Sequence, residues 1–198
     1  MTAVERLYAE PLAETPALKR IRHLSLPFEI IFALLAALGA ILFVTICLVA
    51  LFYTGENFRL TASGPTLYLG HDAFAPGSVK ISDVPLASRL IGLVPLSVIQ
   101  GSLIGAFYCL HRLFGAYRRG VVFAEAPVQW MRRAGFLLIA FAVAPLVFQP
   151  LVQGAGLMDR EWLHGHTIAA LLVGASLFVL ASVITLGRDI EKEGQGYV

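Results

Sequence analysis

Four side chains of metal-binding types stand close together in the last third of the chain. They are Asp159, Glu161, His164 and His166, within the segment QGAGLMDREWLHGH. Carboxylates and imidazoles bind zinc and similar divalent ions, but the spacing of these four matches no recognised metal motif. We therefore interpret the segment as a polar loop and keep only His164 and His166 as weak candidate metal ligands.

The other histidines could act as haem ligands only if they faced each other at one depth between helices. His23 and His111 stand at one edge of the apolar runs, whereas His71 lies in a polar segment at the other edge. This arrangement does not favour haem. The sequence also offers no serine or cysteine nucleophile with a nearby base, no HExxH pair and no phosphate-binding glycine loop. We predict a protein that is not an enzyme and has no cofactor.

A cluster of arginines lies between two long apolar runs, in the segment LHRLFGAYRRGVVFAEAPVQWMRR at residues 110–133. Five of the fifteen Lys and Arg residues fall there: Arg112, Arg118, Arg119, Arg132 and Arg133. Each would cost roughly 2.5–3.5 kcal/mol inside hydrocarbon, so we expect all five at a membrane surface. The positive-inside bias of short loops predicts that this surface is the cytoplasmic one.

The composition agrees with a membrane protein. The 198 residues are 58% hydrophobic and only 14% charged, whereas charged residues make up about a quarter of soluble proteins. The net charge of +2 is small. It indicates contact with anionic lipid rather than direct contact with nucleic acid.

Four apolar stretches predict transmembrane helices at residues 28–53, 86–117, 134–152 and 167–186, since about 20 apolar residues cross a bilayer. The remaining segments are a cytoplasmic part with a short interfacial helix (1–27), an extracytoplasmic β-loop (54–85), the basic connector (118–133), an outer loop (153–166) and a cytoplasmic tail (187–198). Glu29 is the only charge in the first span, and we expect Arg22 or the inner loop to pair with it. Eleven Lys and Arg residues then lie inside and four outside, which predicts both termini in the cytoplasm.

Residues 54–85 alternate between apolar and polar side chains around Phe58 and Leu60, and Ser63-Gly64-Pro65 is typical of a turn. This pattern predicts a β-hairpin, with Val79-Lys80-Ile81 as a third short strand. An isolated hairpin is marginal in water, so it should pack on the helices or on another protein. The predicted fold class is an all-α membrane protein with four transmembrane helices and a small extracytoplasmic β-hairpin element between the first two.

Small residues recur every four positions in the second span, at Ser97, Gly101 and Gly105. This spacing lets helices approach closely in a membrane. We predict that these three residues serve helix packing.

The segment LHRLFGAYRRGVVFAEAP, residues 110–127, resembles the Leu/Phe-x-x-Tyr-x-x-Gly-x-x-Phe connector of a bacterial family of four-span membrane proteins, the domain-of-unknown-function 2975 family. The β-loop, the WMRR entry to the third span and the charged tail agree with this resemblance, which extends over about residues 28–198. The resemblance implies no catalytic residues. It also implies similarity to membrane partners of small helix-turn-helix regulators, and hence a sensing or sequestering role as one option.

We therefore expect a non-enzymatic protein of the bacterial inner membrane that acts through protein contacts, as a regulator or as an accessory subunit of a larger membrane complex. Its expected partners are membrane lipids and another protein, either a membrane complex or a small cytoplasmic regulator. The expected cytoplasmic contact residues are Arg118, Arg119, Phe123, Trp130, Arg132 and Arg133. The alternative is a carrier of a small ligand, metal or haem that uses an interhelical cavity or the loop of His164 and His166.

Overall fold

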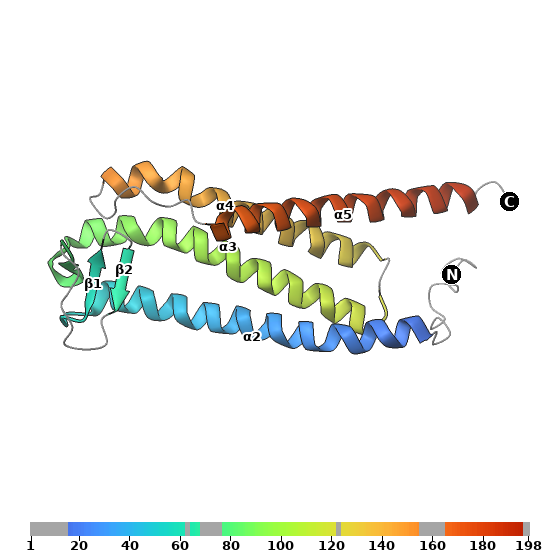
Figure 1. Ribbon diagram of the computed structural model, residues 1–198, viewed down its shortest axis with the longest axis horizontal. Coiled ribbons are helices and arrows are strands. Elements are labelled where there is room, and N and C mark those ends of the chain that lie inside the picture. The colour runs from blue at the N-terminus through green and yellow to red at the C-terminus, as the bar shows by residue number, and fades with distance from the viewer. Residues whose placement is uncertain (1–15, 62–63, 68–76, 122–123, 155–164, 196–198) are drawn as a thin grey trace.

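Four long helices dominate the computed structural model, which describes residues 16–61, 64–67, 77–121, 124–154 and 165–195 (Figure 1). They are α2 (Pro16–Phe52), α3 (Leu86–Arg118), α4 (Glu125–Gly154) and α5 (Gly165–Gln195). Each contains a stretch long and apolar enough to cross a membrane: Lys19–Phe52, Leu86–Arg118, Glu125–Gly154 and Thr167–Gly187. The prediction of a multi-pass membrane protein with four spans is confirmed.

Two helices begin nine or more residues before the predicted spans. Helix α2 passes through Pro27 without a break, so the expected short helix before residue 28 is part of it. Helix α4 starts at Glu125 and has the buried Pro127 in its first turn, where the missing N–H of proline costs nothing. Trp130, Arg132 and Arg133 therefore lie on a helix rather than in a loop.

The C-terminus of α3 is closed by a glycine. Gly120 has a φ of 81°. Its N–H donates to the carbonyl oxygen of Tyr117 at 2.9 Å, and the N–H of Val121 donates to that of Ala116 at 3.0 Å. These two bonds form the Schellman motif, which satisfies carbonyls at a helix end and reverses the chain toward α4.

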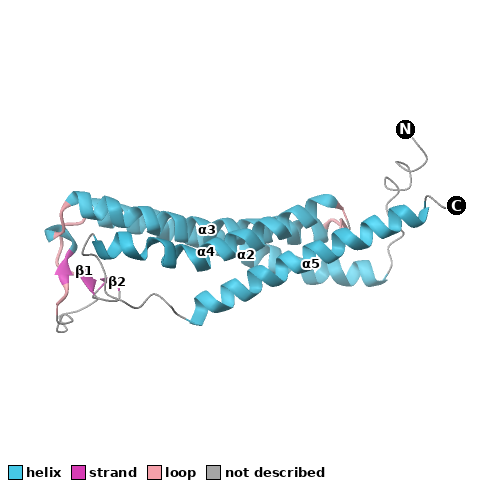
Figure 2. Ribbon diagram, turned by 90° about the horizontal axis from the view of Figure 1, so that it is seen from above, coloured by secondary structure: helices cyan, strands magenta, loops and turns pink. Residues whose placement is uncertain are grey.

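The principal helix contacts run in chain order, from α2 to α3, from α3 to α4 and from α4 to α5. Figure 2 shows α5 running obliquely to the other three helices. A buried cluster of Leu113 from α3, Val128 and Met131 from α4 and Ala181 from α5 joins three helices near one end. Large apolar side chains stay exposed along all four helices, as expected of surfaces that face lipid rather than water.

A small sheet lies between α2 and α3 in sequence. Its strands are β1 (Phe58–Thr61), β2 (Gly64–Leu67) and β3 (Val79–Lys80), in the antiparallel order β2-β1-β3. The predicted hairpin is confirmed, but the turn predicted at Ser63-Gly64-Pro65 is wrong in part. Thr61 pairs with Gly64, so Gly64 and Pro65 belong to β2.

The sheet packs on the ends of α2 and α3. Tyr53 is the residue that follows the end of α2. Its ring packs edge-on against Phe58, with the ring centroids 6.3 Å apart. Arg89 of α3 donates from Nε to the carbonyl oxygen of Val84 and from Nη2 to that of Ser82, both at 2.8 Å. Its Nη1 reaches the carbonyl oxygen of Ala50 in α2 at 3.5 Å.

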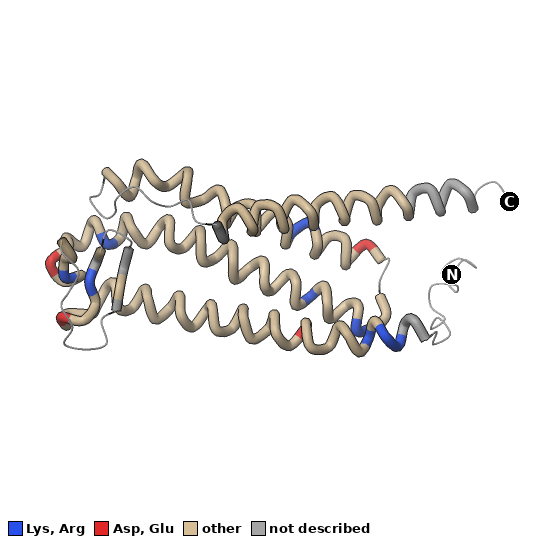
Figure 3. Tube along the Cα trace, viewed as in Figure 1, with Lys and Arg blue, Asp and Glu red and all other residues tan. Residues whose placement is uncertain are grey.

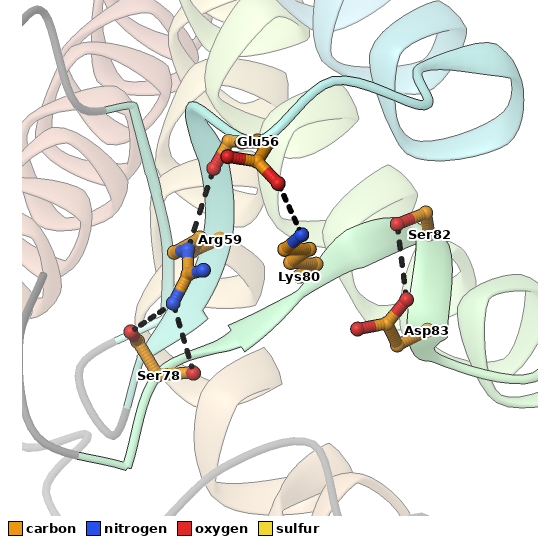
Figure 4. A network of polar contacts seen from close by, with 6 residues as sticks. All are labelled: Glu56, Arg59, Ser78, Lys80, Ser82 and Asp83. Atoms are coloured by element: carbon orange, nitrogen blue, oxygen red, sulfur yellow. Dashed lines mark hydrogen bonds and ion pairs between the residues drawn. The ribbon is translucent and has the colours of Figure 1, made fainter.

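Polar contacts also join the strands to one another, as Figure 4 shows. Lys80 forms an ion pair with Glu56. Arg59 donates to the carbonyl oxygen of Glu56 at 3.3 Å and to the hydroxyl of Ser78 at 3.1 Å. These bonds tie β1 and β3 to the segment that leaves α2.

Candidate functional site

Charged residues gather at both ends of the molecule, and the end that holds the start of α2 is basic (Figure 3). There Arg118, the last residue of α3, places Nε 3.0 Å from Oε2 of Glu29 on α2. The Glu29 side chain is 14% exposed and that of Arg118 is 48% exposed. Oε2 of Glu29 accepts no hydrogen bond from the residues that the structure describes, so the attraction is one of charge. The expected pairing of Glu29 with the inner loop is confirmed.

Further contacts fix α2 against α3 around this pair. Nδ1 of His111 lies 3.1 Å from the backbone oxygen of Glu29, and it must carry the proton because a carbonyl only accepts. Nε of Arg22 donates to the carbonyl oxygen of Arg118 at 3.0 Å. A Cβ built on Gly115 would lie 3.1 Å from Oε1 of Glu29. A side chain at position 115 would therefore require the Glu29 carboxylate to shift by a few tenths of an ångström.

The start of α2 thus lies beside the end of α3, and their cations share one surface. We call this surface the basic end; it consists of Lys19, Arg20, Arg22, Arg118 and Arg119, all of them exposed. Exposed apolar side chains stand next to them in sequence, at Ile21, Leu24 and Val121. A surface of this kind can bind an acidic partner that also offers apolar side chains.

A second group of cations surrounds Trp130. The guanidinium carbons of Arg112 and Arg133 lie 5.5 Å and 5.0 Å from the centroid of its indole ring. These are distances of cation–π attraction. The ring of Tyr108 meets the same indole edge-on at 6.2 Å. Two arginine side chains, one from α3 and one from α4, therefore pack against a single tryptophan ring.

A groove of about 590 Å³ lies beside this group, between α3, α4 and α5. Its apolar wall consists of Gly105 and Cys109 from α3, Phe136 and Leu137 from α4, and Phe178 from α5, and its remaining lining is Tyr108, Trp130, Arg132 and Arg133. Arg132 also donates from Nη2 to the hydroxyl oxygen of Thr185 at 3.2 Å. We call this feature the arginine–tryptophan groove.

Five of the six predicted contact residues therefore divide between two places. Arg118 and Arg119 belong to the basic end, whereas Trp130, Arg132 and Arg133 line the groove. Phe123 lies outside the described residues. Sequence reasoning missed the association of Trp130 with Arg112 and Tyr108. A signal existed, since Tyr108 and Arg112 are four residues apart and so share a helix face.

The predicted packing residues differ in their surroundings. A Cβ on Gly105 would lie 3.1 Å from the side chain of Leu137, so α3 and α4 approach closely there. Gly101 is exposed, and a Cβ built on it would meet nothing within 4 Å. Ser97 is also exposed, and its hydroxyl donates to the carbonyl oxygen of Leu93 at 2.7 Å. Within this chain, close packing thus occurs at Gly105, whereas Ser97 and Gly101 face outward.

The candidate metal ligands lie at the edge of the described residues. His164 falls outside them, and His166 is the second residue of α5, with a side chain that is not described. Among side chains in the described parts of the chain, no group of three or more His, Cys, Asp or Glu is placed to hold a metal ion.

Comparison with known proteins gives one family. A family model with the description "Protein of unknown function (DUF2975)" matches residues 87–195, more than half of the chain. The match includes the connector and the WMRR segment that carried the resemblance, so that resemblance is confirmed. It does not include residues 28–86, over which the resemblance had been extended. Curated proteins and solved structures gave no match.

Proposed function

This chain belongs to the DUF2975 family, a family of unknown function with four membrane spans in this member, and we propose that it acts without catalysis, through contacts with another protein. In this proposal it is a regulator or an accessory subunit in the bacterial inner membrane. The basic end is the contact surface, and both termini are cytoplasmic.

One observation carries the proposal: Lys19, Arg20 and Arg119 extend from two helices that the Glu29–Arg118 pair holds together. The position of this surface therefore depends on helix packing and not on a loose loop. Exposed charges of one sign steer partners of the opposite sign and make association sensitive to salt. The expected partner has an acidic face, on either a membrane complex or a small cytoplasmic regulator.

The charge distribution supports the proposed orientation. Of the fifteen Lys and Arg residues, eleven belong to the segments predicted from the sequence to be cytoplasmic and four to those predicted to be outside. Such a bias favours the basic side in the cytoplasm. A cysteine introduced at position 20, with Cys47 and Cys109 replaced by alanine, should react with a membrane-impermeant maleimide only after the membrane is opened. Labelling of intact cells would contradict the orientation.

The contact is tested by native mass spectrometry of tagged protein, extracted from its own membranes in mild detergent. We expect a second polypeptide at fixed stoichiometry. The double variant Arg20→Glu/Arg119→Glu should lose it, and Arg20→Lys/Arg119→Lys should keep it. We choose these two positions because Arg118 also supports the fold. Isolation of the unaltered chain alone, even after crosslinking in cells, would refute the proposal.

A further inference from the structure

The arginine–tryptophan groove has the features of a lipid site. The first is the distance of its arginines from the helix ends. Arg112 lies six residues before the end of α3, and Arg133 lies eight residues after the start of α4. At 1.5 Å per residue these positions are about 9 Å and about 12 Å inside the helix ends. Tyr108 and Trp130 lie with them, and such aromatic side chains favour the boundary between headgroups and hydrocarbon.

The charge of the site is the second feature. Neither Arg112 nor Arg133 has a carboxylate within ion-pair distance in the part of the chain that the structure describes. Both cations instead lie against one indole ring. Arg133 lines the groove and Arg112 packs on the same indole ring, so the two positive charges repel each other, and an anion bound to both would relieve the repulsion. A phosphodiester suits them, because guanidinium groups bind phosphate oxygens in a planar, bidentate manner.

The apolar wall is the third feature, and it favours a lipid over a free phosphate as the ligand. Phe136 is 64% exposed, and Tyr108 and Phe178 are also exposed, so the groove opens toward the lipid side of the helices. Its volume lies in the range of roughly 300–1,000 Å³ typical of small-molecule sites. A free phosphate would leave this apolar surface unused, whereas an acyl chain covers it.

We propose that the arginine–tryptophan groove binds one anionic phospholipid. The headgroup phosphate is bound by Arg112 and Arg133 beside Trp130, and an acyl chain lies along Leu137 and Phe178. The proposal does not depend on a protein partner at the basic end. It requires only that this end of the helices lies at a membrane surface, where basic pockets between helices are known to hold anionic headgroups.

The test uses the fluorescence of Trp130 in vesicles. The chain has two tryptophans, so Trp162→Phe leaves Trp130 as the only source of tryptophan fluorescence. The protein is placed in phosphatidylcholine vesicles that contain a small fraction of lipid with brominated chains, which quench a tryptophan on contact. We expect brominated phosphatidylglycerol to quench about tenfold more effectively per mole than brominated phosphatidylcholine, because two arginines each contribute a several-fold preference.

Matched variants locate the effect. Arg112→Gln/Arg133→Gln should lose the preference for phosphatidylglycerol, whereas Arg20→Gln/Arg119→Gln, which removes two charges from the basic end, should keep it. If both pairs reduce the preference equally, attraction to the bilayer surface explains it and the proposal is wrong. Equal quenching by the two lipids in the parent protein would also overturn the proposal, whether or not the glutamine variant folds.

A free phosphate is separated from a lipid by competition. Inorganic phosphate at millimolar concentration should leave the preference as it is in chloride of the same ionic strength. If phosphate alone abolishes the preference, the site takes a small anion and not a lipid. Arg112→Lys/Arg133→Lys serves as the conservative variant and should retain part of the preference, because lysine keeps the charge but not the fork of donors.

Discussion

Gly135 of α4 and Gly174 of α5 face each other so closely that a Cβ on either residue would lie 2.8 Å from the carbonyl oxygen of the other. The contact is reciprocal and involves backbone atoms, which cannot turn aside as a flexible side chain can. It joins α4 to α5, which runs obliquely to the other helices (Figure 2). The absence of side chains at both positions allows this contact.

Alanine at either glycine should therefore push α4 and α5 apart. We expect Gly135→Ala and Gly174→Ala each to lower the free energy of unfolding by about 1–3 kcal/mol, the usual cost of overpacking. Unfolding in mixed micelles measures the loss. Gly101→Ala is the matched control, since a Cβ there meets nothing within 4 Å. It should be neutral or slightly stabilising, because alanine favours helix. Equal losses at all three positions would contradict the close contact.

The ion pair of Glu29 and Arg118 should respond unequally to loss of its two members. Arg118→Gln leaves a carboxylate with little exposure, and we expect a cost of about 2 kcal/mol, below the roughly 3–5 kcal/mol of fully buried pairs. Glu29→Gln leaves a half-exposed guanidinium and should cost less than about 1 kcal/mol. Chemical unfolding in detergent compares them. The double variant should cost less than Arg118→Gln alone, and equal single costs would show that the pair is effectively solvated.

The ion pair between Glu56 and Lys80 should depend on pH. The hydrogen bond from Lys80, together with its positive charge, lowers the pKa of Glu56 from the ordinary value of 4.5. A lowered pKa in the folded state means that the pair contributes its full stabilisation above about pH 4.5. The contribution is lost as the pH falls through the lowered pKa. Carbon NMR of labelled Glu56 measures this titration.

Variants of Lys80 test the cause. Lys80→Gln should return the Glu56 titration toward its ordinary range, and Lys80→Arg should keep it low. If Glu56 titrates identically in the parent protein and in Lys80→Gln, the pair does not persist in solution.

Arg89 should couple the sheet to the helices, since it donates to carbonyl oxygens of Ser82, Val84 and Ala50. Each hydrogen bond that involves a charged group contributes about 1.5–3 kcal/mol to stability. Arg89→Met should therefore open residues 77–85 locally while the helices stay folded. Hydrogen exchange of the Val79 and Lys80 amides checks this, and Arg89→Lys should be intermediate. Unchanged exchange in Arg89→Met would show that the sheet holds itself in place.

The sequence predicted the helices and strands better than it predicted the contacts between them. Hydropathy was sufficient for the four spans, and alternation was sufficient for the strands around Phe58. Local pattern also suggested a partner for Glu29, since a lone carboxylate in a span requires one. Each of these signals can be read within a single segment of the chain, without knowing how segments pack.

The remaining features depend on how helices turn toward one another. Arg118 and Trp130 are twelve residues apart in one basic segment, yet they lie at different sites because α3 and α4 each present several faces. The contact of Gly135 with Gly174 depends on the rotation of both helices about their axes. No spacing within either helix reports that rotation. The same limit applies to α3, where two of the three regularly spaced small residues, Ser97 and Gly101, face outward.

The order of helix packing has a consequence for how the protein is made. Each helix after α2 packs on the helix directly before it in the chain, so on leaving the ribosome it finds that neighbour already in the bilayer. Contacts between consecutive segments close short loops and form quickly. A chain synthesised as far as Gly154 would already contain Glu29 with Arg118 and Trp130 with Arg112. Translation of α5 then adds Phe178 to the groove, so a helix made after the other three completes the proposed lipid site.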